Sequence, residues 1–177
     1  MQKMNIFIQF LRDRRGVAAV EAAFIIPILV ILLLGSVGAF DLFRADRSIS
    51  HSANTVVDLA SRMEVMNDQN RDALFATGQA LLGKFSSNSD YAISLASILN
   101  DGTQLTVVWS EANANGAEIV DGELASLDLP DIPENESVIF VRVENNYAPI
   151  FGSGLDFDRE SSRRPRFVAQ IAYDTGP

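Results

Sequence analysis

A carboxylate inside an apolar segment is the first residue of this sequence whose chemistry needs an explanation. Glu21 is the only charged residue in the run Val17–Phe40. A carboxylate in a membrane segment costs on the order of a few kcal/mol. A cut after Gly16 would give Val17 a free α-amine, whose ordinary pKa of about 7.7–8.0 keeps it cationic at neutral pH. We therefore expect Glu21 to pair with a terminal amine, either that of its own chain or that of a neighbour.

Other residues that could take part in catalysis or ligand binding have simpler interpretations. His51 is the only histidine and the chain has no cysteine, which excludes disulfides, thiolate metal sites and thiol nucleophiles. Asp156, Asp158 and the acidic loop 121–136 could bind a hard cation through oxygen, but their spacing matches no EF-hand loop. The basic run 163–166 could contact an acidic partner or simply be solvated. We predict no catalytic, cofactor-binding or metal-binding residue, and therefore no enzyme.

Charge is unevenly distributed along the chain, whose formal net charge is −9. Four basic residues and Asp13 give the first sixteen residues a charge of +3. Ten basic and twenty-two acidic residues give the remaining 161 a charge of −12. So acidic a surface argues against nucleic-acid binding, which needs clustered Lys and Arg to neutralise phosphates. It suits a solvated domain outside the cytoplasm.

The segment 17–40 predicts a transmembrane helix. Ala22–Phe40 is a run of nineteen uncharged residues, close to the length that crosses the hydrocarbon core of a bilayer. A buried core helix is the alternative, but such segments usually have only about 10–14 apolar residues. The sequence RDRR precedes the run, so the leader 1–16 should stay in the cytoplasm and the C-terminal part should lie outside. Pro27 removes one backbone hydrogen bond and should kink the helix.

An amphipathic stalk helix is predicted over 41–66. Apolar and small side chains recur at helical spacing along one stripe. The stripe comprises Leu42, Ala45, Ile49, Ala53, Val56, Leu59, Met63 and Met66. Anchor and stalk together predict one helix of about fifty residues. A break near Gly35 or Gly38 would instead give two separate helices.

Residues 67–177 predict an extracytoplasmic α+β domain. Asn70 is the expected N-cap of a short second helix, whose apolar face includes Leu74, Gly78 and Phe85. Apolar runs bounded by turn residues then predict an antiparallel sheet of about four strands. The expected strands are 91–99, 104–110, 137–143 and 167–173. Asp101-Gly102 is typical of a hairpin between the first two strands. We expect the apolar stripe of the stalk to cover the sheet.

The junction of leader and apolar run resembles the signal of type IV pilins that a prepilin peptidase cleaves. A basic leader ends in Gly16, an apolar run follows, and Glu21 and Pro27 are fifth and eleventh after the glycine. These offsets, with Ala23, resemble the TadE-like minor pilins (pseudopilins) of tight-adherence (Flp type IV) pilus systems. TadG-type relatives share the N-terminal signature. The segment 137–149 is similar to a strand with a Tyr and a Pro near the end of TadE-like proteins.

The resemblance implies cleavage between Gly16 and Val17, an assembly contact through Glu21 and a helix kink at Pro27. Its implied partners are a prepilin peptidase, other pilin subunits, inner-membrane pilus assembly proteins and the lipid bilayer. It implies a single-pass protein of the bacterial inner membrane that acts in the assembly of the pilus or a related secretion apparatus. Two alternatives remain: a secretory signal cut before Phe40, which releases an exported binding domain, and an uncleaved anchor for an envelope adaptor.

Overall fold

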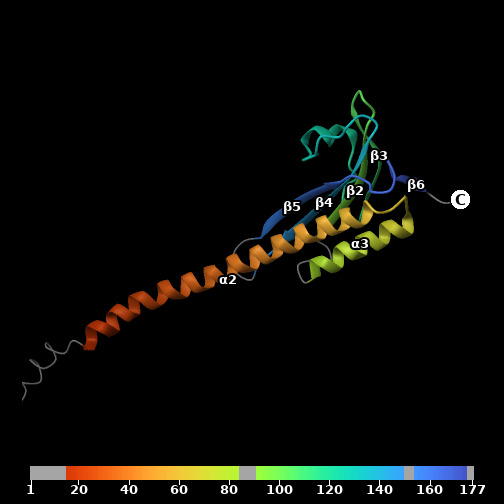
Figure 1. The fold of residues 1–177 in the computed structure, drawn as a ribbon. Helices are drawn as coiled ribbons and strands as arrows, with labels where there is room; N and C mark the ends of the chain where they lie inside the picture. The colour runs from red at the N-terminus through yellow and green to blue at the C-terminus, as the bar shows by residue number, and fades with distance from the viewer. Residues whose placement is uncertain (1–14, 84–90, 150–153, 175–177) are drawn as a thin grey trace, which may run out of the picture. The chain divides into compact units, whose positions relative to one another are not determined.

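Two units make up the chain. The computed structural model describes residues 15–83, 91–149 and 154–174. The chain divides after Phe40 into the units Met1–Phe40 and Asp41–Pro177. Helix α2, Arg15–Ala60, supplies the described part of the first unit and the first element of the second (Figure 1). The second unit combines two helices with an antiparallel sheet of four strands, which confirms the predicted α+β class.

Helix α2 is one continuous helix of 46 residues, without a break at Gly35 or Gly38. It ends at Ala60, six residues before the predicted end at Met66. The Arg62 N–H donates to the Leu59 oxygen at 3.2 Å, three residues back, so the last turn is tightened in the manner of a 3₁₀ helix.

The residues after α2 form a strand because a distant segment pairs with them. Strand β1, Val65–Asn67, pairs in parallel with β6, Ala172–Asp174, near the end of the described chain. Met66 is fully buried there, so the apolar stripe continues in the core while the backbone has left the helix. The predicted helical end at Met66 is therefore wrong, since a non-local strand pair overrides the local helical pattern.

The short second helix, α3, spans Asp68–Leu82. Its N-cap is Asn67, whose side-chain oxygen accepts from the Asn70 N–H at 2.8 Å, so the predicted cap at Asn70 is wrong by one turn. Both residues are good caps, and the end of β1 at Asn67 selects between them. The predicted apolar residue Phe85 lies outside the described residues.

Helix α3 lies beside the C-terminal part of α2 (Figure 1). The Ser52 hydroxyl donates to the Gly78 carbonyl at 2.9 Å, and the Ser48 hydroxyl donates to the Leu81 carbonyl at 2.7 Å. A Cβ on Gly78 would lie 2.7 Å from Ile93 Cδ1 and 3.1 Å from Val56 Cγ2. The absence of a side chain at position 78 therefore allows α3 to pack closely against α2 at this point.

The main sheet has the strand order β3-β2-β4-β5, with every pair antiparallel. Strand β2 spans Tyr91–Asn100, β3 spans Leu105–Ala112 and β4 spans Ser137–Tyr147. These three strands confirm the predicted ones and extend them by one to four residues. The β2–β3 hairpin turns at Gly102, whose φ of 86° suits glycine.

The predicted fourth strand at 167–173 is wrong. The fourth strand, β5, is Leu155–Arg163, and it pairs along its length with β4. None of its residues is buried, and its side chains are mostly charged or polar, so apolar alternation does not mark it. Only the end of the predicted segment is strand, as part of β6.

Hydrophobic clusters cover both faces of the sheet. On one face, residues of the second half of α2 pack with β2 and β4, as predicted for the stalk. This cluster includes Ile49, Ala53, Val56, Val57, Ala60, Ile93, Leu95, Ile139, Val141 and Val143. Leu59, which was placed in the predicted stripe, is instead exposed. On the other face, Ile119, Leu124, Leu127 and Ile132 from the segment around the 3₁₀ helix η2, Asp121–Ser126, cover Phe140.

Candidate functional site

The first half of α2 exposes apolar side chains around its whole circumference. Phe24 is 71% exposed and Ile31 is 69% exposed, and large apolar residues from Val17 to Phe40 share this exposure. This is the one helix among the described residues that is long and apolar enough to cross a membrane, and none of its most apolar window is buried. A core helix of a soluble protein is mostly buried, so this exposure favours a membrane-type helix over a core helix.

The predicted processing and assembly residues all lie on this half of α2. Gly16 and Val17 are in its first turn, and both are exposed. Glu21 is also exposed and follows Val17 by four residues, which places the two on the same helix face about 6 Å apart along the axis. A Cβ added at Gly16 would meet nothing within 4 Å. The fold of the chain therefore does not itself require glycine there.

Pro27 lies inside α2, and the helix continues on both sides of it. Proline has no N–H, so the carbonyl one turn earlier, at Ala23, loses its usual helical partner. Transmembrane helices tolerate this loss when a neighbouring helix or a local adjustment satisfies the carbonyl. Ala23 and Pro27 thus define a point on the exposed apolar surface where the backbone can accept a hydrogen bond.

Gly16, Glu21 and Pro27 thus follow one another along the exposed apolar half of α2. Residues 16–58 match the family model for TadE-like proteins. The matched segment begins at Gly16 and ends near the end of α2, so it covers both the exposed apolar half and the half that packs on the sheet. Neither a curated protein nor a solved structure matches the chain significantly.

This match confirms, over residues 16–58, the predicted resemblance to the TadE-like proteins of the Tad pilus system. The matched segment contains Gly16, Glu21, Ala23 and Pro27, the residues on which the resemblance rests. The apolar helix near the N-terminus is compatible with single-pass membrane anchoring. Pilus proteins and lipid are the partners that the match and the helix together suggest.

A buried polar contact marks the start of the second unit, and sequence reasoning missed it. The Tyr147 hydroxyl donates to the Asp41 carboxylate, which is only 7% exposed. Burial, followed by this hydrogen bond and the charge of Asp41, raises the pKa of Tyr147 to about 12. The contact ties the end of β4 to α2 at the first residue after the apolar half. The acid directly after the apolar run was the available signal, but its partner is 106 residues away.

Arginines converge on one aspartate where α2 meets the end of β5. Asp58 forms ion pairs with Arg62, with Arg163 at 3.2 Å and with Arg166 at 2.7 Å. Burial raises the pKa of Asp58, but the hydrogen bond from Arg62 and the charges of the three arginines outweigh it, and the pKa lies below its ordinary value of 3.8. The basic run 163–166 is therefore only in part a solvated segment.

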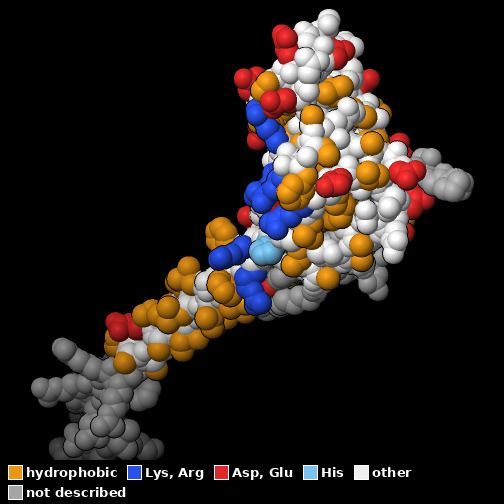
Figure 2. Space-filling model, turned by 45° about the vertical axis from the view of Figure 1, so that its right-hand side comes forward, with side chains coloured by type: hydrophobic (Ala, Val, Ile, Leu, Met, Phe, Trp, Pro, Cys, Tyr) orange, Lys and Arg blue, Asp and Glu red, His pale blue; other side chains and the backbone are white. Residues whose placement is uncertain are grey.

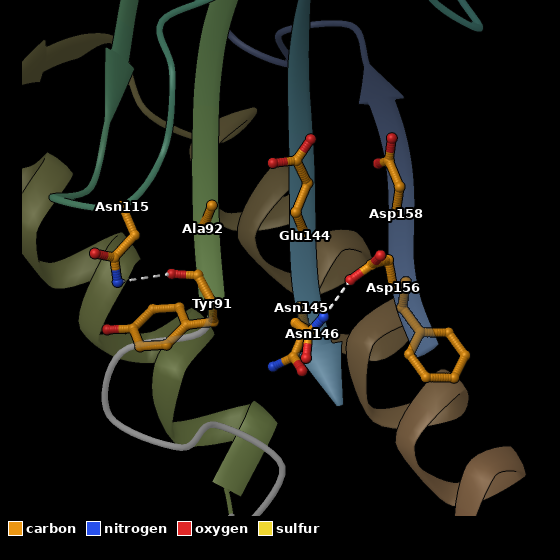
Figure 3. A pocket seen from close by; sticks show the side chains of 9 residues that line it. Tyr91, Ala92, Asn115, Glu144, Asn145, Asn146, Asp156 and Asp158 are labelled. Atoms are coloured by element: carbon orange, nitrogen blue, oxygen red, sulfur yellow. Dashed lines mark hydrogen bonds between the residues drawn. The ribbon is translucent and has the colours of Figure 1, made fainter. Parts of the chain in front are cut away.

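An acidic hollow of about 370 Å³ lies near one end of the sheet (Figure 3). Its polar lining includes three carboxylates, of Glu144, Asp156 and Asp158, and the side chains of Asn115, Asn145 and Asn146. Burial raises the pKa of Asp158, as does the charge of Glu160, while Arg142 and Arg159 oppose them. Within the described ranges, no group of three or more His, Cys, Asp or Glu side chains could hold a metal ion.

His51 lies on the exposed side of α2. Its Nδ1 is 3.1 Å from the Thr55 hydroxyl, one helical turn further on. This contact is local to the helix, because Thr55 follows His51 by four residues. The imidazole instead borders a surface hollow that Arg44 and Arg47 also line.

Proposed function

We propose that this chain is a membrane-anchored minor pilin, or pseudopilin, that a prepilin peptidase cleaves between Gly16 and Val17. Its role is in the assembly of a tight-adherence pilus or of the related secretion apparatus, and it catalyses no reaction. The observation that carries the proposal is the TadE-like segment 16–58, which begins at the proposed cut and includes the exposed apolar half of α2. The anchor lies in the bacterial inner membrane. The leader lies in the cytoplasm and the second unit, Asp41–Pro177 (unit 2), lies outside, because the leader is basic.

The position of the cut supports this proposal. Helix ends open more readily than helix centres, and the Gly16–Val17 bond lies in the first turn of α2. Open space around Gly16 supports a role of its small size in recognition by the peptidase, because the described residues leave room for a side chain there. Cleavage gives Val17 an amine one helical turn from Glu21, so a carboxylate and an ammonium share one face of an otherwise apolar helix.

Glu21 then acts after cleavage rather than during it. In a membrane, an unpaired carboxylate or ammonium is costly, so each favours the other as a neighbour. Pairing within one chain and pairing between adjacent chains both satisfy this requirement. Pairing between chains would join pilin subunits through their anchors, and Pro27 would allow the helix to bend within such a bundle.

Co-expression with a prepilin peptidase tests the proposal, with mass spectrometry of the mature N-terminus as the readout. The native chain should begin at Val17, and Gly16→Leu should remain uncut because the bulky residue blocks the peptidase. Glu21→Gln is the matched variant: it should be cut normally but should co-purify with other pilins less well. A mature chain that begins at Phe40 would identify a secretory signal, and a native chain that keeps its leader would identify an uncleaved anchor. Either result would refute the proposed processing.

A further inference from the structure

Four arginines of unit 2 form a basic surface on an acidic protein. This arginine surface consists of Arg62 just after α2, Arg159 and Arg163 on β5, and Arg166 just after β5. Figure 2 shows Lys and Arg side chains gathered in a band beside the single histidine, whereas Asp and Glu side chains are frequent at the far end of the domain. The segment 101–141 has nine acidic residues and no Lys or Arg. The domain is therefore strongly polarised.

The arginine surface holds more positive charge than its own carboxylates neutralise. Asp58 pairs with three of the arginines and Asp46 pairs with Arg159, so four cations share two anions. The side chains of Arg163 and Arg166 are each 45% exposed. A guanidinium has five N–H donors, whereas one carboxylate accepts about four hydrogen bonds, so donors remain for a second acidic partner.

Strand β5 also carries negative charge, on the face opposite its arginines. Arg159 and Arg163 pair in register with Val143 and Ile139, which belong to the cluster under α2. Asp156 and Asp158 alternate with them and so lie on the opposite face, where Figure 3 shows Glu144 and Asp158 projecting from neighbouring strands.

The acidic hollow places like charges directly across two strands. Glu144 and Asp158 are opposite one another in the β4–β5 register. Like charges in this position destabilise a sheet. The nearby Arg142 offsets this only in part, because its guanidinium already bonds to Glu160 and Glu123. The hollow therefore favours a cationic partner, as the arginine surface favours an anionic one.

We propose that the arginine surface of one copy docks on the acidic hollow of a second copy. Within one chain the arginines and the three carboxylates lie on opposite faces of the sheet, so a second copy is needed to bring them together. Each copy offers one surface of each sign, which makes the contact heterologous: it joins copies head to tail and extends in a row unless the rotation closes a ring. Arginine is well suited to such contacts because its planar guanidinium binds carboxylates in a bidentate manner. The contact involves unit 2 alone and does not depend on cleavage at Gly16.

Site-directed cross-linking of the full chain in membranes tests this contact, and the absence of native cysteine leaves no background. Asn54→Cys marks the arginine surface, since the Asn54 side chain accepts from Ser161 on β5, and Asn146→Cys marks the acidic hollow. Two differently tagged copies, one with each change, should be joined by a short bismaleimide. Asn54→Cys paired with Ala76→Cys, on the exposed side of α3, is the matched control and should yield no product.

Charge reversal then identifies the cause of the cross-link. Arg166→Glu in the Asn54→Cys copy should lower the yield about tenfold or more, and Asp158→Arg in the other copy should restore it. High salt should reduce the native yield, and Gly16→Leu should leave it unchanged. Equal product in the control pair, no product in either pair, or no rescue by the second reversal would each overturn the proposal. A cross-linking yield that depends only on the content of anionic lipid in the membranes would assign the arginines to lipid phosphates instead.

Discussion

The two halves of α2 are similar in helical content but differ in what covers their apolar side chains. Residues 16–40 expose large apolar side chains on all sides, whereas residues 41–60 bury a single stripe against the sheet. Val56 is fully buried, while Ile31, in the first half, is 69% exposed. The first half thus depends on lipid or on other chains for burial, and the second half finds it within its own domain. One helix therefore joins the proposed anchor to the core of a folded unit.

The largest expected effect is the difference in stability between two variants that each place a carboxylate in one half of α2. Val56→Asp should lower the free energy of unfolding of unit 2 by about 4 kcal/mol or more, because it buries a charge without a partner. Ile31→Asp should change that free energy by less than about 0.5 kcal/mol, because the Ile31 side chain is exposed rather than buried. Denaturant unfolding of the full chain in detergent, followed by fluorescence, measures both. The only tryptophan, Trp109, packs on the core and donates from its indole to the Ile171 carbonyl, so it reports on unit 2.

A pair of glycine variants sharpens the same comparison with a smaller effect. Gly78→Val should destabilise unit 2 by about 1–3 kcal/mol, because the new side chain would meet Ile93 and Val56 where α3 touches α2. Gly35→Val should leave the unfolding transition in place, because a Cβ there meets nothing within 4 Å. The same fluorescence measurement applies. Equal stability of the two variants would mean that α3 does not pack on α2 through position 78.

The smallest expected effect is a loss of stability in acid through Asp58. The pKa of Asp58 is lowered in the folded chain, so its contribution is present above its ordinary pKa of 3.8 and is lost as the pH falls through the lower, folded value. Asp58→Asn should therefore reduce the difference in melting temperature between pH 5 and pH 3. Glu118→Gln, at an exposed position in the second unit, is the control and should retain the native difference. An unchanged difference in Asp58→Asn would show that the three arginines do not stabilise the folded chain through this aspartate.

Several elements of the fold could be predicted from the sequence because their signals are local. The stripe on the second half of α2, the hairpin at Gly102 and the strands β2 to β4 all follow from periodicity and turn residues. Prediction failed for β5, because an edge strand without buried residues has no apolar alternation. It also failed for the end of α2, because β1 forms only through its pairing with β6, more than 100 residues away.

The candidate site divides in the same way. Gly16, Glu21 and Pro27 are predicted from their offsets, because the proposed processing signal is a linear pattern. The arginine surface and the acidic hollow are not, because Arg62 and Arg166 are more than 100 positions apart and meet only at Asp58. Asp156 and Asp158 were noted as a short acidic run, but their juxtaposition with Glu144 depends on the β4–β5 register.

The sequence by itself determined that the chain has a membrane-type helix with one carboxylate near its start. It also determined that a stripe of apolar side chains follows, which must be buried against another element. Both are properties of side chains at short separations along a helix, where geometry is fixed by 3.6 residues per turn. Only the tertiary structure decided that this helix ends at Ala60, that a polar segment completes the sheet, and that opposite charges occupy opposite faces of β5. Those outcomes depend on contacts between distant segments, which compete with local preference and here outweigh it.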